Sequence, residues 1–312
     1  MAKHTRRDFL KRTALAGGAM ALAPLGHAAG QDAAAEMCIA SWKGPVAAQG
    51  DVPAAMATKL TEQAVAAIGG MKRFVSQGDV VWVKPNIAWD RAPQFGANTN
   101  PDVVATLVRL CLEAGAKKVK VGDNTCNPAK KSYPNSGIEA AAKAVGAEMV
   151  YIDENRFKDV SIKGERLDKW LLYPEIIESD LVINCPVVKD HSIAHATVCM
   201  KNYMGVAGGQ RGLWHQNLAL CLCDITAFMK PPMCVVDATR IMTGNGPTGG
   251  NLSDVKQVNT VAAGTDIVAL DAFGSELLGL EPAKVKSVAA GQAAGLGTMD
   301  YRSLALKELE VT

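Results

Sequence analysis

The chain has 312 residues with 33 Lys or Arg and 31 Asp or Glu, a formal charge of +2, and 48% hydrophobic but only 5% aromatic residues. The near balance of charge, with no basic patch or stripe, excludes a nucleic-acid partner. The aliphatic composition predicts a core of Val, Ala, Leu and Ile, and the length suits one large α/β domain or two small ones.

The first residues have the pattern of a twin-arginine export signal. Arg6 and Arg7 stand in a charged segment at 5–11, a weakly apolar run follows at 13–23, and small residues close it at 26–28. We expect the twin-arginine translocase to export the folded protein, and cleavage after residue 28 to leave a periplasmic product of residues 29–312. A short N-terminal helix of the domain is the alternative, but it leaves the arginine pair unexplained.

The same segment bears on membrane attachment and on charge. The apolar run is shorter than the about 20 residues that a membrane-spanning helix needs, so we expect no permanent membrane anchor. Residues 1–28 hold five Lys or Arg and one Asp, which leaves 28 basic and 30 acidic residues in 29–312. The basic balance of the full chain therefore belongs to the signal.

Strands and helices alternate along the rest of the chain. Continuous apolar runs at 80–83, 118–122, 149–152, 181–188 and 234–236 are typical of buried parallel strands. Helices are predicted from the N-cap Asn100 to Gly115, near 136–145 and over 266–278. This alternation predicts an α/β fold with one domain, in which helices cover both faces of a mostly parallel, doubly wound sheet.

Polar side chains follow four of these apolar runs at the point where each run ends. They are Lys84 and Asn86, then Asp123, then Lys189 and His191, and finally Asp237. Ligands of open α/β sheets bind in the crevice outside the carboxyl ends of the strands. We therefore expect a Lys/His/Asp crevice that binds a small anionic ligand. The alternative, that strand ends simply meet polar loops, explains the repeated Lys, Asp and His less well.

Segment 188–205 carries a family resemblance. Its Lys189-Asp190-His191 at a strand end, followed by Thr197, Lys201-Asn202 and Gly205, resembles the hallmark of the family known as domain of unknown function 362. Residues 84–86, 121–123, 237, 244–250 and 261–272 fit the same family pattern. The resemblance covers roughly residues 78–280. It implies an α/β fold and no established reaction.

Cysteine usage departs from that family. Many relatives carry a ferredoxin-like module with Cys-x2-Cys-x2-Cys-x3-Cys runs for [4Fe–4S] clusters. The eight cysteines of this chain are scattered and form no ferredoxin-type [4Fe–4S] motif. The cofactor is therefore unknown, and a transition metal is the candidate.

The candidate metal ligands lie just after the run at 181–188. If residues 191–201 are helical, His191, His195 and Cys199 share one face, and Asp237 or His215 completes a metal site. The alternative is that His191 alone is functional while His195 and Cys199 face the core, where cysteine is often buried.

Further candidate residues follow from the cationic character of the crevice. Lys201 is the candidate base or nucleophile, because Lys189 and His191 nearby would lower its pKa. We take His191, Lys201, Lys189 and Asp237 as the catalytic candidates. The ligand-binding candidates are Lys84, Asn86, Asp123, Asn202, Arg211, which follows a Gly-rich stretch, and Gly246, whose loop offers backbone amides to an anion.

Three functions fit these residues. The first is an enzyme of unknown reaction that binds a small anion and a metal in the crevice. The second is a non-catalytic periplasmic binding or assembly protein for a redox system. The third is a racemase-like enzyme, since the spacing of His191 and Lys201 resembles that in the nickel-pincer lactate racemase family, which binds its cofactor through a Lys. This chain lacks that family's Gly-Gly just before the Lys.

Overall fold

The structure is a computed structural model that describes residues 34–46 and 52–312. The predicted signal peptide, residues 1–28, lies outside the described residues. Within those ranges, no helix has both the length and the apolar character that crossing a bilayer requires.

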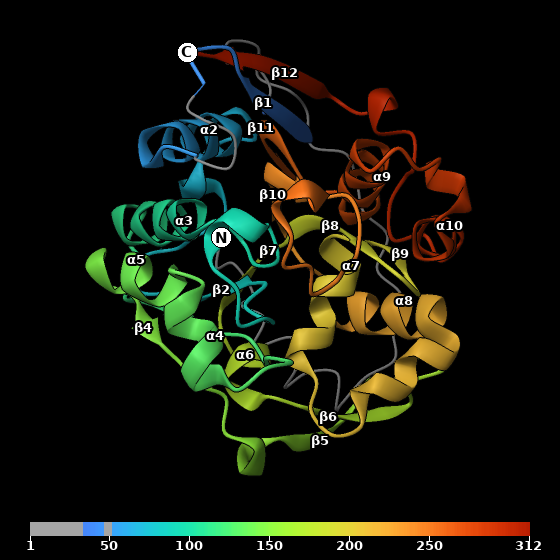
Figure 1. Cartoon of the computed structure of the whole chain (residues 1–312). Coiled ribbons are helices and arrows are strands. Elements are labelled where there is room, and N and C mark those ends of the chain that lie inside the picture. Colours follow the sequence, from blue (N-terminus) through green and yellow to red (C-terminus); the bar gives the residue numbers. More distant parts are fainter. Residues whose placement is uncertain (1–33, 47–51) are drawn as a thin grey trace, which may run out of the picture.

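A ten-stranded mixed sheet forms the centre of the molecule (Figure 1). Six of its pairings are parallel and three are antiparallel, the latter being β1 with β11, β11 with β10, and β8 with β9. Its main path runs β12 (Leu306–Val311), β1 (Met37–Trp42), β11 (Val255–Gly264), β10 (Cys234–Met242), β7 (Leu181–Cys185), β2 (Val80–Pro85), β3 (Lys118–Val121), β4 (Glu148–Met149). Beside β10 lies β8 (Val187–His191), which also pairs with β9 (His195–Thr197).

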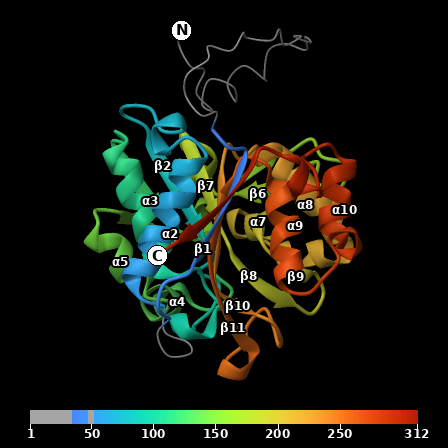
Figure 2. The ribbon, with the colours of Figure 1, turned by 90° about the horizontal axis from the view of Figure 1, so that it is seen from above.

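Helices cover both faces of this sheet, which confirms the predicted α/β class (Figure 2). One face carries α2 (Ala54–Ala67), α3 (Pro101–Glu113), α4 (Ala129–Asn135) and α5 (Ile138–Ala144). The other carries α7 (Cys199–Asn202), α8 (Leu218–Met229), α9 (Ile267–Leu277) and α10 (Lys286–Ala293). The short α6 (Pro174–Ile177) and the hairpin of β5 (Lys158–Ser161) and β6 (Lys169–Leu172) lie on this second side.

The apolar runs have the composition that a sheet covered on both faces requires. Successive side chains of a strand point to opposite faces. Val81 and Val83 of β2 therefore pack into the core beneath α3, whereas Trp82 packs into the core on the other face. Because both faces of the strand are buried, apolar residues occupy every position of the run instead of every second one.

The run predicted as one strand at 181–188 is two strands. Pro186 separates β7 from β8, because proline has no N–H to donate to a sheet ladder. β7 pairs with β2, whereas β8 pairs with β10 on one side and with β9 on the other. Lys189 and His191 therefore lie on a strand that is separate from β7.

The helix over 191–201, on which the three-ligand metal site depended, is absent. Residues 187–197 form the β8–β9 hairpin, in which His191 lies opposite His195, and α7 begins only at Cys199. The β-branched Val187, Val188 and Thr197 favour strand geometry. Asp271 of α9 then starts the helix by accepting hydrogen bonds from the amides of Cys199 and Met200 at 2.6 and 3.2 Å.

Candidate functional site

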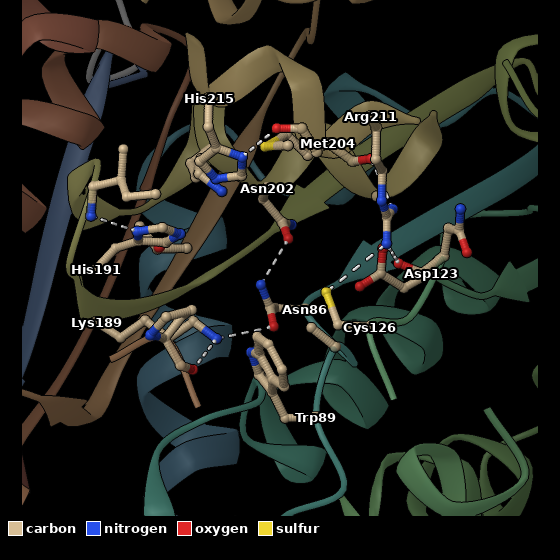
Figure 3. Close-up of a pocket in the computed structure, with 18 residues that line it drawn as sticks. Asn86, Trp89, Asp123, Cys126, Lys189, His191, Asn202, Met204, Arg211 and His215 are labelled. Carbon is tan, nitrogen blue, oxygen red and sulfur yellow. Dashed lines mark hydrogen bonds between the residues drawn. The ribbon is translucent and has the colours of Figure 1, made fainter. Parts of the chain in front are cut away.

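A cavity of about 350 Å³ opens at the carboxyl ends of β2, β3 and β8 (Figure 3). Its walls come from the segments after β2 and β3, from β8 and β9, from α7, and from the turn after it. The residues lining it are Asn86, Ala88, Trp89, Asp123, Asn124, Cys126, Lys189, His191, Ile193, Thr197, Lys201, Asn202, Met204, Gly205, Arg211, Gly212, His215 and Pro247. The predicted crevice at the strand ends therefore exists as a cavity.

Beneath the cavity, Lys84 and Asp123 form a buried ion pair. Lys84 Nζ lies 2.7 Å from Asp123 Oδ1, and both side chains are almost completely buried. The lysine also donates to Pro85 O and Asn202 Oδ1, each at 3.0 Å. Burial lowers the pKa of Lys84, and the Asp123 carboxylate opposes that shift. Lys84 does not line the cavity, so its role is to hold Asp123 and Asn202 in place.

Asn202 connects this ion pair to the cavity wall. Its Oδ1 accepts from Lys84 Nζ and, at 3.3 Å, from Asn86 Nδ2. Its Nδ2 donates to Lys84 O and to Asn184 Oδ1 at 3.2 and 2.8 Å. Every polar atom of the buried amide is therefore paired, which fixes α7 against the ends of β2 and β7.

Lys189 of β8 is a buried cation whose N–H groups are all used. Its Nζ donates to Ala97 O at 2.6 Å, Pro247 O at 3.2 Å and Asn86 Oδ1 at 3.3 Å. The Trp89 ring lies 5.9 Å from the same nitrogen. Burial lowers the pKa of Lys189 to about 7, and the Lys201 charge adds to this effect.

His191 and His215 stack in the cavity with a centroid distance of 5.4 Å and an interplanar angle of 25° (Figure 3). His191 Nδ1 accepts from the amides of Ile193 and Ala194 at 3.1 and 3.3 Å, so the proton of the neutral ring lies on Nε2. His215 Nδ1 is 3.0 Å from Gly212 O, which only accepts, so His215 carries its proton on Nδ1 and leaves Nε2 as an acceptor. The two rings therefore have opposite tautomers.

Both histidines are neutral at ordinary pH for the same physical reason. Burial, together with the smaller effect of the Lys201 charge, lowers the pKa of His191 to about 3. Burial also lowers the pKa of His215, and Lys201 acts in the same direction. The pair thus presents one N–H donor and one lone pair to a ligand.

Lys201, on the last turn of α7, lines the cavity and is partly exposed to it. Burial of the Lys201 amine lowers its pKa to about 8, and the positive charge of the nearby Arg211 contributes to that shift. Among the described residues, its Nζ has no hydrogen-bond or ion-pair partner. It is therefore the cavity lysine whose amine is available to a ligand.

Arg211 closes the cavity opposite Lys189. Its Nη1 donates to Met204 O at 2.9 Å and its Nη2 to Asn124 O at 2.8 Å and Thr125 O at 3.1 Å. Nη2 also lies 3.9 Å from the Sγ of Cys126, whose side chain is exposed. Arg211 thus ties the turn after α7 to the loop after β3 and adds a positive charge to the cavity wall.

The three proposed metal ligands do not converge. His191 lines the cavity, His195 is exposed at the edge of the hairpin with a φ of 63°, and Cys199 is fully buried at the start of α7. The three were grouped on the assumption of a helix that the hairpin replaces. Searching residues 34–46 and 52–312 finds no cluster of three or more His, Cys, Asp or Glu side chains that could hold a metal ion.

Asp237 and Gly246 also lie outside the cavity wall. Asp237 is buried in β10 and accepts from Asn100 N at 2.7 Å and from the amide and hydroxyl of Thr239 at 2.9 and 2.7 Å. It therefore positions the start of α3, and burial raises its pKa. Gly246 N donates to Asp190 Oδ2 at 3.0 Å, and a Cβ there would overlap with the backbone of Asp190. The loop of Gly246 reaches the cavity through Pro247 instead.

Several cavity residues escaped the sequence reasoning. Trp89 and Met204 stand in segments without a recognisable motif. Thr197 lines the cavity with a buried hydroxyl that has no hydrogen-bond partner among the described residues. Its place after Lys189 and His191 in the family pattern was the one available signal.

The fold and the cavity define an α/β protein with a cationic ligand site at the strand ends, and comparison with known proteins gives its family. Residues 81–276 match the sequence profile described as Domain of unknown function (DUF362). A curated relative, Thylakoid-associated protein sll1697 of Synechocystis sp., is 30% identical over 237 residues, which cover 73% of this chain and 72% of the relative. This chain belongs to the DUF362 family, which confirms the resemblance over 78–280.

Among solved structures, the chain is similar to the lactate racemase apoprotein from Thermoanaerobacterium thermosaccharolyticum. The TM-score is 0.49 at 12% sequence identity, with 77% of this chain covered. The chain covers 56% of that protein, somewhat more than half of its length.

Proposed function

We propose that this protein binds a small organic anion in the cavity and acts on it through Lys201 and the two histidines. The observation that carries the proposal is an imbalance of charge. Lys189, Lys201 and Arg211 contact the cavity, whereas Asp123, the one carboxylate among the described lining residues, is paired with Lys84. Buried charges are costly unless they are paired, so an anionic ligand supplies the missing partner.

The size of the cavity narrows the ligand class. A volume of about 350 Å³ lies at the lower end of small-molecule sites, which span about 300–1,000 Å³. Trp89 and Met204 add apolar contacts to the polar wall. A compact carboxylate or phosphate with a short carbon skeleton fits these dimensions and charges.

The test is a calorimetric titration of the full protein with oxalate and with phosphate. Lys201→Met should weaken binding by at least about tenfold, because a charge-assisted hydrogen bond contributes about 1.5–3 kcal/mol. Lys307→Met, which removes an exposed lysine of β12, is the matched control and should leave affinity unchanged. Equal affinity in both variants, or no binding of either anion by the wild type, would contradict the proposal.

Two alternatives predict different results for protein isolated from its own host. A non-catalytic binding or assembly protein of a redox system would hold an anion and turn over no substrate. A racemase-like enzyme with a Lys-bound nickel-pincer cofactor would carry nickel together with a permanent mass increment on Lys201. Metal analysis and intact-mass spectrometry of that sample identify the racemase-like enzyme, and an assay for turnover of the bound anion separates the non-catalytic protein from the proposal.

A further inference from the structure

Two lysines, Lys189 and Lys201, line the cavity and a third, Lys84, lies beneath it, and the amines of Lys84 and Lys189 are saturated. An ammonium group has three N–H donors. Lys84 Nζ and Lys189 Nζ each have three oxygen acceptors within 3.3 Å. Lys201 Nζ has none among the described residues, although it lines the same cavity. The fold thus keeps two cations fixed and leaves one amine available.

From this contrast we infer that Lys201 forms an imine with the ketone carbon of a small α-keto acid bound in the cavity. The inference deepens the proposed function, on which it rests, because it names the ligand class. Lys189 and Arg211 carry the charges that attract the carboxylate. A lysine amine is a nucleophile toward carbonyl carbons when its surroundings favour the uncharged form.

The surroundings of Lys201 meet that condition. The amine is enclosed by the cavity wall and lies near Arg211, so the ammonium form is opposed by burial and by that like charge. Its pKa of about 8 leaves about a tenth of the amine uncharged at pH 7. Lys189 also has a lowered pKa, about 7, but its Nζ is engaged by three oxygen acceptors, so it is not available as the reacting nitrogen.

The histidine pair has the tautomers that imine formation requires. His191 Nε2–H is a donor that can polarise the ketone oxygen without giving up its proton, as a neutral imidazole does elsewhere. His215 Nε2 has a free lone pair that can accept a proton from the attacking nitrogen. The unpartnered hydroxyl of Thr197 lies in the same wall as a further hydrogen-bonding group.

The step balances without an additional reagent. The lone pair of Lys201 Nζ forms a C–N bond with the ketone carbon, and the C=O π pair moves onto the oxygen. The nitrogen loses two protons in total, and the oxygen takes up both and leaves as water, so that a C=N bond remains. His215 Nε2 carries protons between the nitrogen and the departing oxygen.

The experiment traps the imine with pyruvate as the probe. Full-length protein is incubated with pyruvate and sodium borohydride, and the adduct is located by peptide mass spectrometry. We expect one borohydride-dependent adduct, on Lys201, in the wild type and in Lys307→Met. Lys201→Arg keeps the charge but has no amine that forms an imine, so it should give no adduct. Acetone, which lacks the carboxylate, should react at least about tenfold more slowly, because binding supplies the orientation.

Calorimetry on the same samples distinguishes a failure of imine formation from a failure of anion binding. If pyruvate and oxalate bind but no adduct forms, or if adducts spread over surface lysines, the imine is refuted and anion binding stands. If neither anion binds to the wild type, both proposals fail. An oxalate-dependent rise in the melting temperature of Lys201→Arg shows whether the cavity of that variant still holds an anion.

Discussion

At the scale of residues, the cavity is governed by the cost of burying positive charge. Lys189 and Lys201 lie in it with pKa values lowered to about 7 and about 8, mainly by burial. His191 is neutral for the same reason. Near neutral pH, these three side chains therefore bind fewer protons in the protein than they would bind in water. An anion reverses this balance because it stabilises the ammonium forms.

This linkage predicts that anion binding takes up protons. Oxalate affinity should be nearly constant below about pH 6 and should fall as pH rises from about 6 to 9, by up to about tenfold per pH unit for each proton taken up. Titrations in two buffers with different ionisation enthalpies measure that uptake directly. In Lys201→Arg, whose guanidinium stays charged, the decline should be shallower. An affinity that is independent of pH, or that increases above pH 7, would exclude charged Lys189 and Lys201 as the binding groups.

At the scale of elements, the segment from α7 through the 3-10 helix Tyr203–Val206 positions the cavity. Asp271 holds its start, Asn202 joins it to β2 and β7, and Gly205 lets it approach the Lys84–Asp123 pair. A Cβ on Gly205 would overlap with the Asp123 carboxylate and lie 2.6 Å from Lys84 Nζ. The close approach therefore depends on the absence of a side chain there.

Gly205→Ala should lower the free energy of unfolding by about 1–3 kcal/mol, because an overpacked site must shift its neighbours. It should also weaken oxalate binding, since Asp123 and Asn202 move with the ion pair. Gly212→Ala is the stability control, because a Cβ there meets nothing within 4 Å. Denaturant titrations of both variants measure the difference. Equal stability of the two would show that the segment tolerates a wider separation from Asp123.

At the scale of the whole molecule, the sheet joins segments that are far apart in the chain. The described first strand, β1, pairs in parallel with the last, β12, and β7 pairs with β2 across about a hundred residues. Such non-local parallel pairing forms slowly. Export of an already folded chain suits a protein of this topology, which is why we propose the twin-arginine route and a periplasmic location.

Replacing Arg6 and Arg7 by Lys keeps the charge of the leader and removes the arginine pair. We expect the folded precursor to accumulate in the cytoplasm of a bacterial host, whereas the wild type is processed and reaches the periplasm. Cell fractionation with immunoblotting measures both pools. Lys11→Arg is the control and should be exported normally. Periplasmic recovery of the double variant at the wild-type level would contradict this route.

Local signals predicted much of the architecture. Asn100 caps α3 through the amide of Asp102, and the helix begins at Pro101, as the sequence indicated. The ends of β2, β3 and β8 bring Asn86, Asp123, Lys189 and His191 into one cavity. The buried parallel strands were recognisable because a strand covered on both faces is apolar at every position.

Asp237 shows where such reasoning stops. Side chains alternate along a strand, so Val236 and Ala238 pack under α7–α10 while Asp237 faces the opposite side and binds the start of α3. Whether a polar residue at a strand end enters the crevice depends on which face of the sheet its side chain points to and on which elements pack against that face. The helical condition of the metal-site hypothesis is not met for a similar reason, because β8 pairs with β10 and β9 whatever the spacing of His191, His195 and Cys199.

By itself, the sequence determined the α/β class, the family and the chemical types gathered at the strand ends, because these depend on local periodicity and on motifs. The tertiary structure decided which of three lysines has a free amine, which tautomer each histidine adopts, and that Asp237 and Cys199 serve the framework. Those properties depend on which carbonyls and amides come within hydrogen-bonding distance from distant parts of the chain. No local pattern encodes that distance.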